Sequence, residues 1–112
     1  MIYDVGFQSR ADADADRIYL YLRSRSDVGA GRWFQALLNR LERLKSDAAG
    51  CPRAKEADRL GEDVRETYFK TRAGNRYRLV FTIEGNNVRI HRIRGRGQRL
   101  LRGNDLELND RS

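Results

Sequence analysis

The sequence predicts an α+β domain with an N-terminal strand, an antiparallel helical hairpin and then a three-stranded antiparallel meander. Apolar residues recur every three or four positions between residues 11 and 48, as in amphipathic helices. Residues 64–95 alternate between apolar and polar types, which is the period of strands. The length of 112 residues fits one domain. We place this domain at residues 1–102 and expect a polar, frayed tail at 103–112, where Leu106 and Leu108 could add a small contact.

The N-terminal half opens with an alternating segment at residues 2–7, which we interpret as a short strand. A helix is expected from Ser9 to about residue 25, because Ser9 and Asp12 have the spacing of a capping box. Asp12, Asp14 and Asp16 lie in its first two turns, where the helix dipole favours negative charge. We therefore interpret these carboxylates as solvated and not as metal ligands.

A second helix follows directly, because Ser26 and Asp27 can end the first helix and cap the next. Its apolar positions continue for about five turns, and we expect Trp33 and Phe34 to lie in the core. Residues 50–52, which include a proline, end this helix. Residues 53–63 form a polar connector that has room for one helical turn.

The meander is predicted from strands at residues 64–71, 77–84 and 87–95. Gly85 and Asn86 are typical of a two-residue hairpin turn, which fixes the register of the last two strands. The expected opposite pairs are Ile83 with Val88, Phe81 with Ile90, Val80 with His91, and Arg78 with Ile93. One face should pack on the helices and carries Tyr77, Leu79, Phe81, Ile83, Val88 and Ile90. The other face should meet solvent and carries Arg78, Thr82, Arg89 and His91.

Positive charge is concentrated in residues 64–102. This stretch has eleven Lys and Arg residues against two acidic ones, whereas the whole chain has a net charge of +7. Such clustering favours binding to a polyanionic partner, such as nucleic acid or a nucleoprotein particle, over a general charge surplus that only aids solubility. The candidate binding residues are Arg65, Arg78, Arg89, His91, Arg94, Arg96 and Arg99.

Several classes of protein are disfavoured by what the sequence lacks. It has no apolar run long enough to cross a membrane, and the first residues lack the charged and apolar regions of a signal peptide, so we expect none. The single cysteine, Cys51, cannot form an internal disulfide, so we expect a cytoplasmic protein. With one histidine, one cysteine and no glycine-rich phosphate loop, we expect neither a metal nor a cofactor.

The order of these motifs resembles the RelE/ParE toxin superfamily of type II toxin–antitoxin modules. The resemblance covers about residues 1–102 and is seen in both halves of the chain. Its residues are Ala30 to Trp33 at the start of the second helix, Val64-Arg65-Glu66-Thr67, Gly74, Tyr77-Arg78-Leu79-Val80-Phe81, Val88 to Ile93, and Arg94-Gly95-Arg96. The fold implied is a strand, two helices and a meander.

This resemblance implies one of two mechanisms. RelE-like members are ribosome-dependent mRNA endonucleases, and for that chemistry the candidate catalytic residues here are Arg78, Arg96, Lys70 and Arg72. ParE-like members inhibit DNA gyrase without hydrolysing nucleic acid. The chain lacks the tyrosine or histidine–tyrosine pair that many nuclease members carry near the C-terminus, and arginine is a poor general base. We therefore favour the gyrase inhibitor over the nuclease, and keep a non-toxic basic binding module as a further alternative.

The resemblance also implies a protein partner, a cognate antitoxin. A basic surface of this kind is best masked by an acidic, partly disordered segment. We expect such a segment to wrap the helical hairpin and lie along an edge of the sheet.

Overall fold

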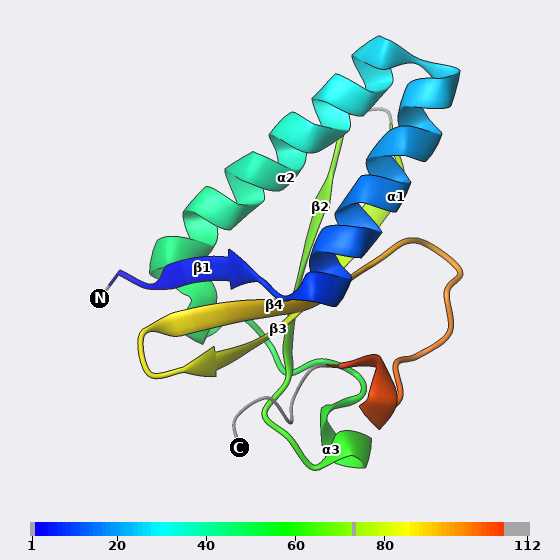
Figure 1. Cartoon of the computed structure of the whole chain (residues 1–112). Helices are drawn as coiled ribbons and strands as arrows, with labels where there is room; N and C mark the ends of the chain where they lie inside the picture. Colours follow the sequence, from blue (N-terminus) through cyan, green and yellow to red (C-terminus); the bar gives the residue numbers. More distant parts are fainter. Residues whose placement is uncertain (1, 73, 107–112) are drawn as a thin grey trace.

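The computed structural model describes residues 2–72 and 74–106 and has the predicted α+β architecture (Figure 1). The helical hairpin packs on a four-stranded mixed sheet. The elements are β1 (Asp4–Phe7), α1 (Ser9–Arg25), α2 (Asp27–Asp47), the short α3 (Ala57–Leu60), β2 (Arg65–Lys70), β3 (Arg76–Glu84) and β4 (Asn87–Arg94), with 3-10 turns at Ala48–Gly50 and Gly103–Asp105. The expected helical turn in the connector is α3.

The strand order is β1-β4-β3-β2, and only part of it is the predicted meander. Strands β2, β3 and β4 are antiparallel neighbours, as expected. Strand β1, whose partner the sequence does not indicate, runs parallel to β4 and places Val5 opposite Val88. A parallel pair needs a long crossover, and the chain from α1 to β3 supplies it. The sheet is therefore mixed.

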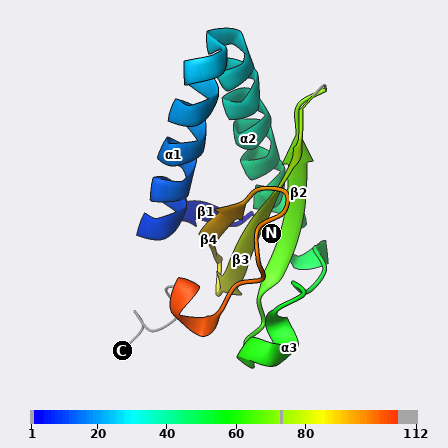
Figure 2. The same ribbon diagram turned by 90° about the vertical axis from the view of Figure 1, so that its right-hand side faces the viewer.

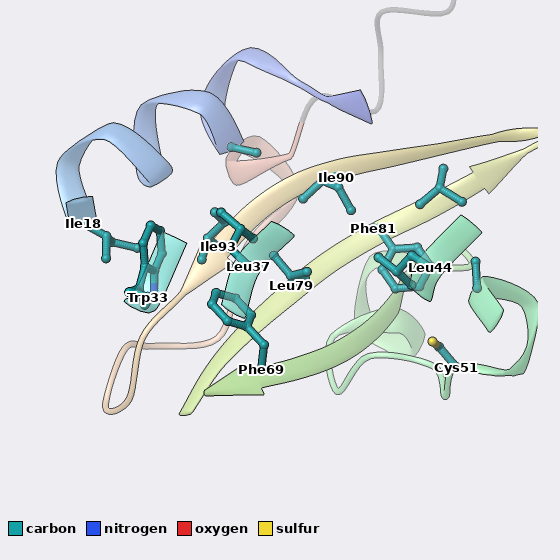
Figure 3. Close-up of a cluster of buried hydrophobic side chains, with 13 residues drawn as sticks. Ile18, Trp33, Leu37, Leu44, Cys51, Phe69, Leu79, Phe81, Ile90 and Ile93 are labelled. Atoms are coloured by element: carbon teal, nitrogen blue, oxygen red, sulfur yellow. The ribbon is translucent and has the colours of Figure 1, made fainter. Parts of the chain in front are cut away.

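Helices α1 and α2 bury their apolar stripes against one face of the sheet (Figure 3). Trp33 is only 2% exposed, as predicted, and its ring lies 5.8 Å from that of Phe69 and 5.7 Å from that of Tyr77, measured between centroids. The prediction for Phe34 was wrong, because its side chain is 45% exposed. Phe34 follows Trp33 by about 100° around the helix, so it points away from the sheet and packs edge-on against Tyr19.

The two helix starts differ in their caps. Ser26 caps α2, because its Oγ accepts a hydrogen bond from the backbone N–H of Gly29 at 3.0 Å. The capping box expected at α1 was wrong. Gln8, and not Ser9, occupies the N-cap position there, and its side chain makes no capping hydrogen bond. Among the described residues, no helix is both long enough and apolar enough to span a bilayer.

Asp14 is buried, so the solvated position expected for it was also wrong. Its carboxylate accepts hydrogen bonds from Arg92 Nε at 2.8 Å and from the backbone N–H of Ile93 at 2.9 Å. Strand β1 ends opposite Ile90, and the next part of β4 has no strand on that side. Asp14 supplies the acceptor that a neighbouring strand would otherwise provide.

The hairpin of β3 and β4 follows the predicted register only as far as Phe81 opposite Ile90. Gly85 has a φ of +62° in the turn, as this turn type requires. A β-bulge then leaves His91 as the extra residue, so that Val80 faces Arg92 and Leu79 faces Ile93. The predicted pairs of Val80 with His91 and of Arg78 with Ile93 were therefore wrong. The bulge brings both Ile90 and Ile93 into the helix-facing core.

Much of the second face of the sheet is covered: Arg78, Thr82 and His91 are buried, which corrects the expectation that they meet solvent. The connector after α2 and the segment after β4 fold back over it, at the end of the molecule opposite the tip of the helical hairpin (Figures 1 and 2). They build a second apolar cluster from Ala54, Ala57, Val64, Val80, Leu101 and Leu106. Leu106 thus makes the contact expected of it, whereas Leu108 lies outside the described residues. His91 is fully buried, with its Nε2 2.9 Å from Thr82 Oγ1.

Candidate anion-binding pocket

The largest group of predicted functional residues meets at a hollow between the sheet and the segment that follows β4. Its volume is about 520 Å³. Strands β2, β3 and β4, the β2–β3 turn and residues 95–100 all contribute to its wall. We call it the anion pocket, and its lining residues are Lys55, Tyr68, Lys70, Gly74, Asn75, Arg76, Arg78, Arg94, Gly95, Arg96, Gly97, Gln98 and Leu100.

Four of the cations of the anion pocket are exposed: Lys55, Lys70, Arg76 and Arg96. Arg76 lies over the ring of Tyr68, with 3.9 Å from its guanidinium carbon to the ring centroid. Among residues 2–72 and 74–106, none of the four forms an ion pair with a carboxylate. Arg40, Arg78, Arg92 and Arg99, in contrast, each form one. Their charge is therefore available to an external anion.

Arg78 also lines the pocket, but its charge is already matched. One guanidinium nitrogen donates to Glu56 at 2.9 Å and to Glu66 at 3.0 Å, and the other donates to Glu56 at 2.7 Å. Glu56 accepts a further hydrogen bond from the backbone N–H of Leu101 at 2.9 Å. Burial would raise the pKa of Glu56, but these donors outweigh it and lower that pKa to about 2. Arg78 thus joins the connector, β2 and the C-terminal segment.

Arg94 is the buried cation of the pocket that lacks such a match. Its side chain is 8% exposed, and one guanidinium nitrogen donates to the backbone carbonyl of Arg99 at 3.0 Å. Its Nε has no hydrogen-bond partner among the described residues, and no carboxylate there pairs with it. Burial and the neighbouring Arg92 lower the pKa of Arg94. A buried guanidinium without a counter-ion favours the arrival of an anion.

The remaining predicted residues lie outside the anion pocket and have other neighbours. Arg65 donates to the backbone carbonyls of Ala49 and Cys51 at 3.0 and 2.8 Å. Arg89 pairs with Glu84 at 3.2 Å, and Arg99 pairs with Asp105 at 2.8 Å. His91 is fully buried. Arg72 lies on the other side of the β2–β3 turn.

Lys55, Arg76 and Tyr68 were missed by the sequence analysis. Arg76 has the same strand parity as Arg78, so a strand predicted to start one residue earlier would have included it. Lys55 belongs to the connector, and no pattern in the sequence indicates that this connector folds back onto the sheet. Tyr68 lies on β2, whose alternation is less regular than that of β3.

Chemically, the anion pocket can bind phosphate groups and stabilise their charge. Among the side chains that line it, Tyr68 is the best candidate for proton transfer. Its hydroxyl donates a hydrogen bond to Glu66 at 3.4 Å. Within the described part of the chain no three His, Cys, Asp or Glu residues are grouped to hold a metal ion. Burial raises the pKa of the Cys51 thiol, which makes this cysteine a weak nucleophile.

Comparison with known proteins identifies a matching family. The model of the family described as ParE toxin of type II toxin-antitoxin system, parDE, matches residues 5–100, which is most of the chain and includes both the helical hairpin and the anion pocket. No curated protein matches the chain.

Proposed function

Because the chain belongs to the ParE toxin family of type II toxin–antitoxin systems, we propose that it arrests growth by binding DNA gyrase without cutting nucleic acid. The composition of the anion pocket supports a non-hydrolytic role. Its described lining has guanidinium, ammonium and phenol groups but no histidine or carboxylate. Arginine holds phosphate well, but it does not accept a proton at neutral pH. The pocket is therefore suited to holding a polyanion in place.

A supercoiling assay with purified gyrase tests this proposal. We expect the purified protein to block supercoiling at a molar excess over gyrase, and the Arg96→Gln variant to be weaker. Full supercoiling activity at a large excess of toxin would contradict the gyrase target. Expression of the chain alone should also slow growth. Unaffected growth would instead favour the basic binding module without toxicity.

A ribosome-dependent nuclease is the second candidate, and Tyr68 is the observation that favours it. Its phenol lies in the same pocket as Lys70, Arg78 and Arg96, which gives a candidate proton-transfer group beside phosphate-binding cations. Primer extension on translating ribosomes would then show cuts in phase with codons, and Tyr68→Phe would abolish them. We expect no such cuts, and we expect Tyr68→Phe to inhibit growth as the native protein does.

The family also implies a cognate antitoxin as a protein partner. We propose that this partner is acidic and that both proteins act in the cytoplasm, where gyrase and ribosomes are found. The net charge of +7 and the unpaired cations of the anion pocket support an acidic partner. The neighbouring reading frame tests this: it should encode a short acidic protein that rescues growth when the two are co-expressed.

A further inference from the structure

A second hollow lies on the other side of the β2–β3 turn. Its volume is about 630 Å³, and it is bounded by the end of α1, the start of α2 and the turn itself. We call it the hairpin pocket, and its lining residues are Leu22, Arg25, Ser26, Gly29, Arg32, Trp33, Thr71, Arg72, Gly74, Asn75 and Tyr77. The candidate nuclease residue Arg72 belongs here and not to the anion pocket.

The hairpin pocket is lined by three arginines, Arg25, Arg32 and Arg72. The described residues include no carboxylate that pairs with any of them, and no carboxylate lines the hollow. The lining also includes the partly buried side chains of Leu22 and Tyr77. Such a lining suits an anionic group joined to a flat or apolar body.

The two hollows share a wall. Gly74 and Asn75 of the β2–β3 turn line both of them, so the turn stands between two basic surfaces. On one side are Lys55, Lys70, Arg76, Arg94 and Arg96, and on the other side are the three arginines of the hairpin pocket. A small anion would occupy one hollow only, whereas a ligand with regularly repeated negative charges can occupy both.

We propose that the two hollows form one track for a single strand of nucleic acid, which crosses the β2–β3 turn and places phosphates on both sides of it. A phosphodiester backbone carries one charge per nucleotide, and its bases can lie against the apolar floor of the hairpin pocket. The backbone chemistry is common to DNA and RNA. This inference goes beyond the proposed function, because contact with nucleic acid would stand whether or not gyrase is the target.

The salt dependence of oligonucleotide binding tests the track. Fluorescence anisotropy would follow oligothymidylates of roughly 20 and roughly 4 nucleotides, a range that covers single-strand sites of this size. The double variant Arg25→Gln/Arg32→Gln removes two cations of the hairpin pocket. The slope of log K against log salt is negative. For the long strand, we expect its magnitude to decrease by about 0.7 for each phosphate that the variant no longer neutralises. The short strand does not need both hollows, and the anion pocket keeps all its cations in this variant, so the short strand should still bind there with the native slope.

A matched control separates this effect from general charge. Arg23→Gln/Arg43→Gln removes two exposed arginines from the same two helices but from outside the hairpin pocket, and its slope should equal that of the native protein. An equal decrease of the slope in both double variants would overturn the proposal, as would failure of the native protein to bind the long strand. Stronger binding of polyglutamate than of the oligonucleotide would also overturn it and assign the hollow to an acidic protein. An oligouridylate of the same length should bind like the oligothymidylate.

Discussion

Arg78 and Arg96 line the same pocket, but their surroundings give them different roles. Arg78 is buried between Glu56 and Glu66, whereas Arg96 is exposed. We expect Arg78→Ala to lower the free energy of unfolding by about 3–5 kcal/mol, because it leaves two buried carboxylates without a counter-ion. Arg96→Ala should change it by less than about 0.5 kcal/mol. Urea unfolding monitored by circular dichroism measures both values.

The inhibition of gyrase gives the complementary measurement. At a temperature where both variants are folded, Arg96→Ala should lose inhibition while Arg78→Ala retains most of it. A stable Arg78→Ala protein would show that the ion pairs with Glu56 and Glu66 contribute little to the fold. Arg78→Lys is a useful intermediate, since it keeps the charge but cannot reproduce the two-pronged contact with Glu56.

Glu56 makes the stability of the protein depend on pH. Its pKa is lowered to about 2 in the folded chain from an ordinary value near 4.5. The carboxylate therefore stabilises the fold fully above about pH 4.5, and this contribution is lost as the pH falls toward 2. We expect Glu56→Gln to be less stable than the native protein at pH 7, with the difference shrinking below pH 4. Urea titrations at each pH measure this difference in the free energy of unfolding. A difference that stays constant with pH would contradict the lowered pKa of Glu56.

At the residue scale, the sequence identifies which cations exist but not which of them are paired. Arg78 and Arg94 lie on adjacent strands and look equivalent in the sequence. Their difference depends on Glu56, which comes from a connector with no regular pattern. His91 shows the same limit, because it is the extra residue of a β-bulge that no local pattern in the sequence indicates.

At the scale of elements, the helices and the meander could be predicted because their periodicity is local. The place of β1 beside β4 could not, because it joins segments about eighty residues apart. The second apolar cluster, on the other face of the sheet, was not predicted for a related reason. Leu101 and Leu106 lie in a polar segment, and their spacing matches neither the period of a helix nor that of a strand.

The segment after β4 is the element whose role is best tested by mutation. Leu101 is fully buried against Val80 and the connector, and its backbone N–H donates to Glu56. We expect Leu101→Ala to lower the free energy of unfolding by about 3 kcal/mol through the cavity that it leaves. Leu100→Ala is the matched control, since the side chain of Leu100 is largely exposed and should matter little. Equal stability of the two variants, measured by thermal unfolding, would mean that this segment does not pack as described.

For the whole molecule, the main feature is that two sets of cations have different surroundings. One set is paired with carboxylates and joins elements, as Arg92 joins β4 to Asp14 of α1. The other set has no such partner among the described residues and surrounds the two hollows beside the β2–β3 turn. The net charge of +7 resides largely in this second set, so the folded scaffold can be nearly neutral while one surface is strongly basic.

Two fourfold variants with the same change in net charge separate these sets. Neutralising Lys55, Lys70, Arg76 and Arg96 with glutamine removes unpaired cations, so we expect the midpoint of thermal unfolding to stay the same or rise as repulsion falls. Gyrase inhibition and growth arrest should then be lost. Neutralising Arg40, Arg65, Arg78 and Arg92 with glutamine removes paired cations. It should leave no cooperative unfolding transition, because the buried carboxylates of Asp14, Glu56 and Glu66 lose their partners. Similar unfolding midpoints for the two variants would contradict the division of the cations, since net charge alone would then explain both results.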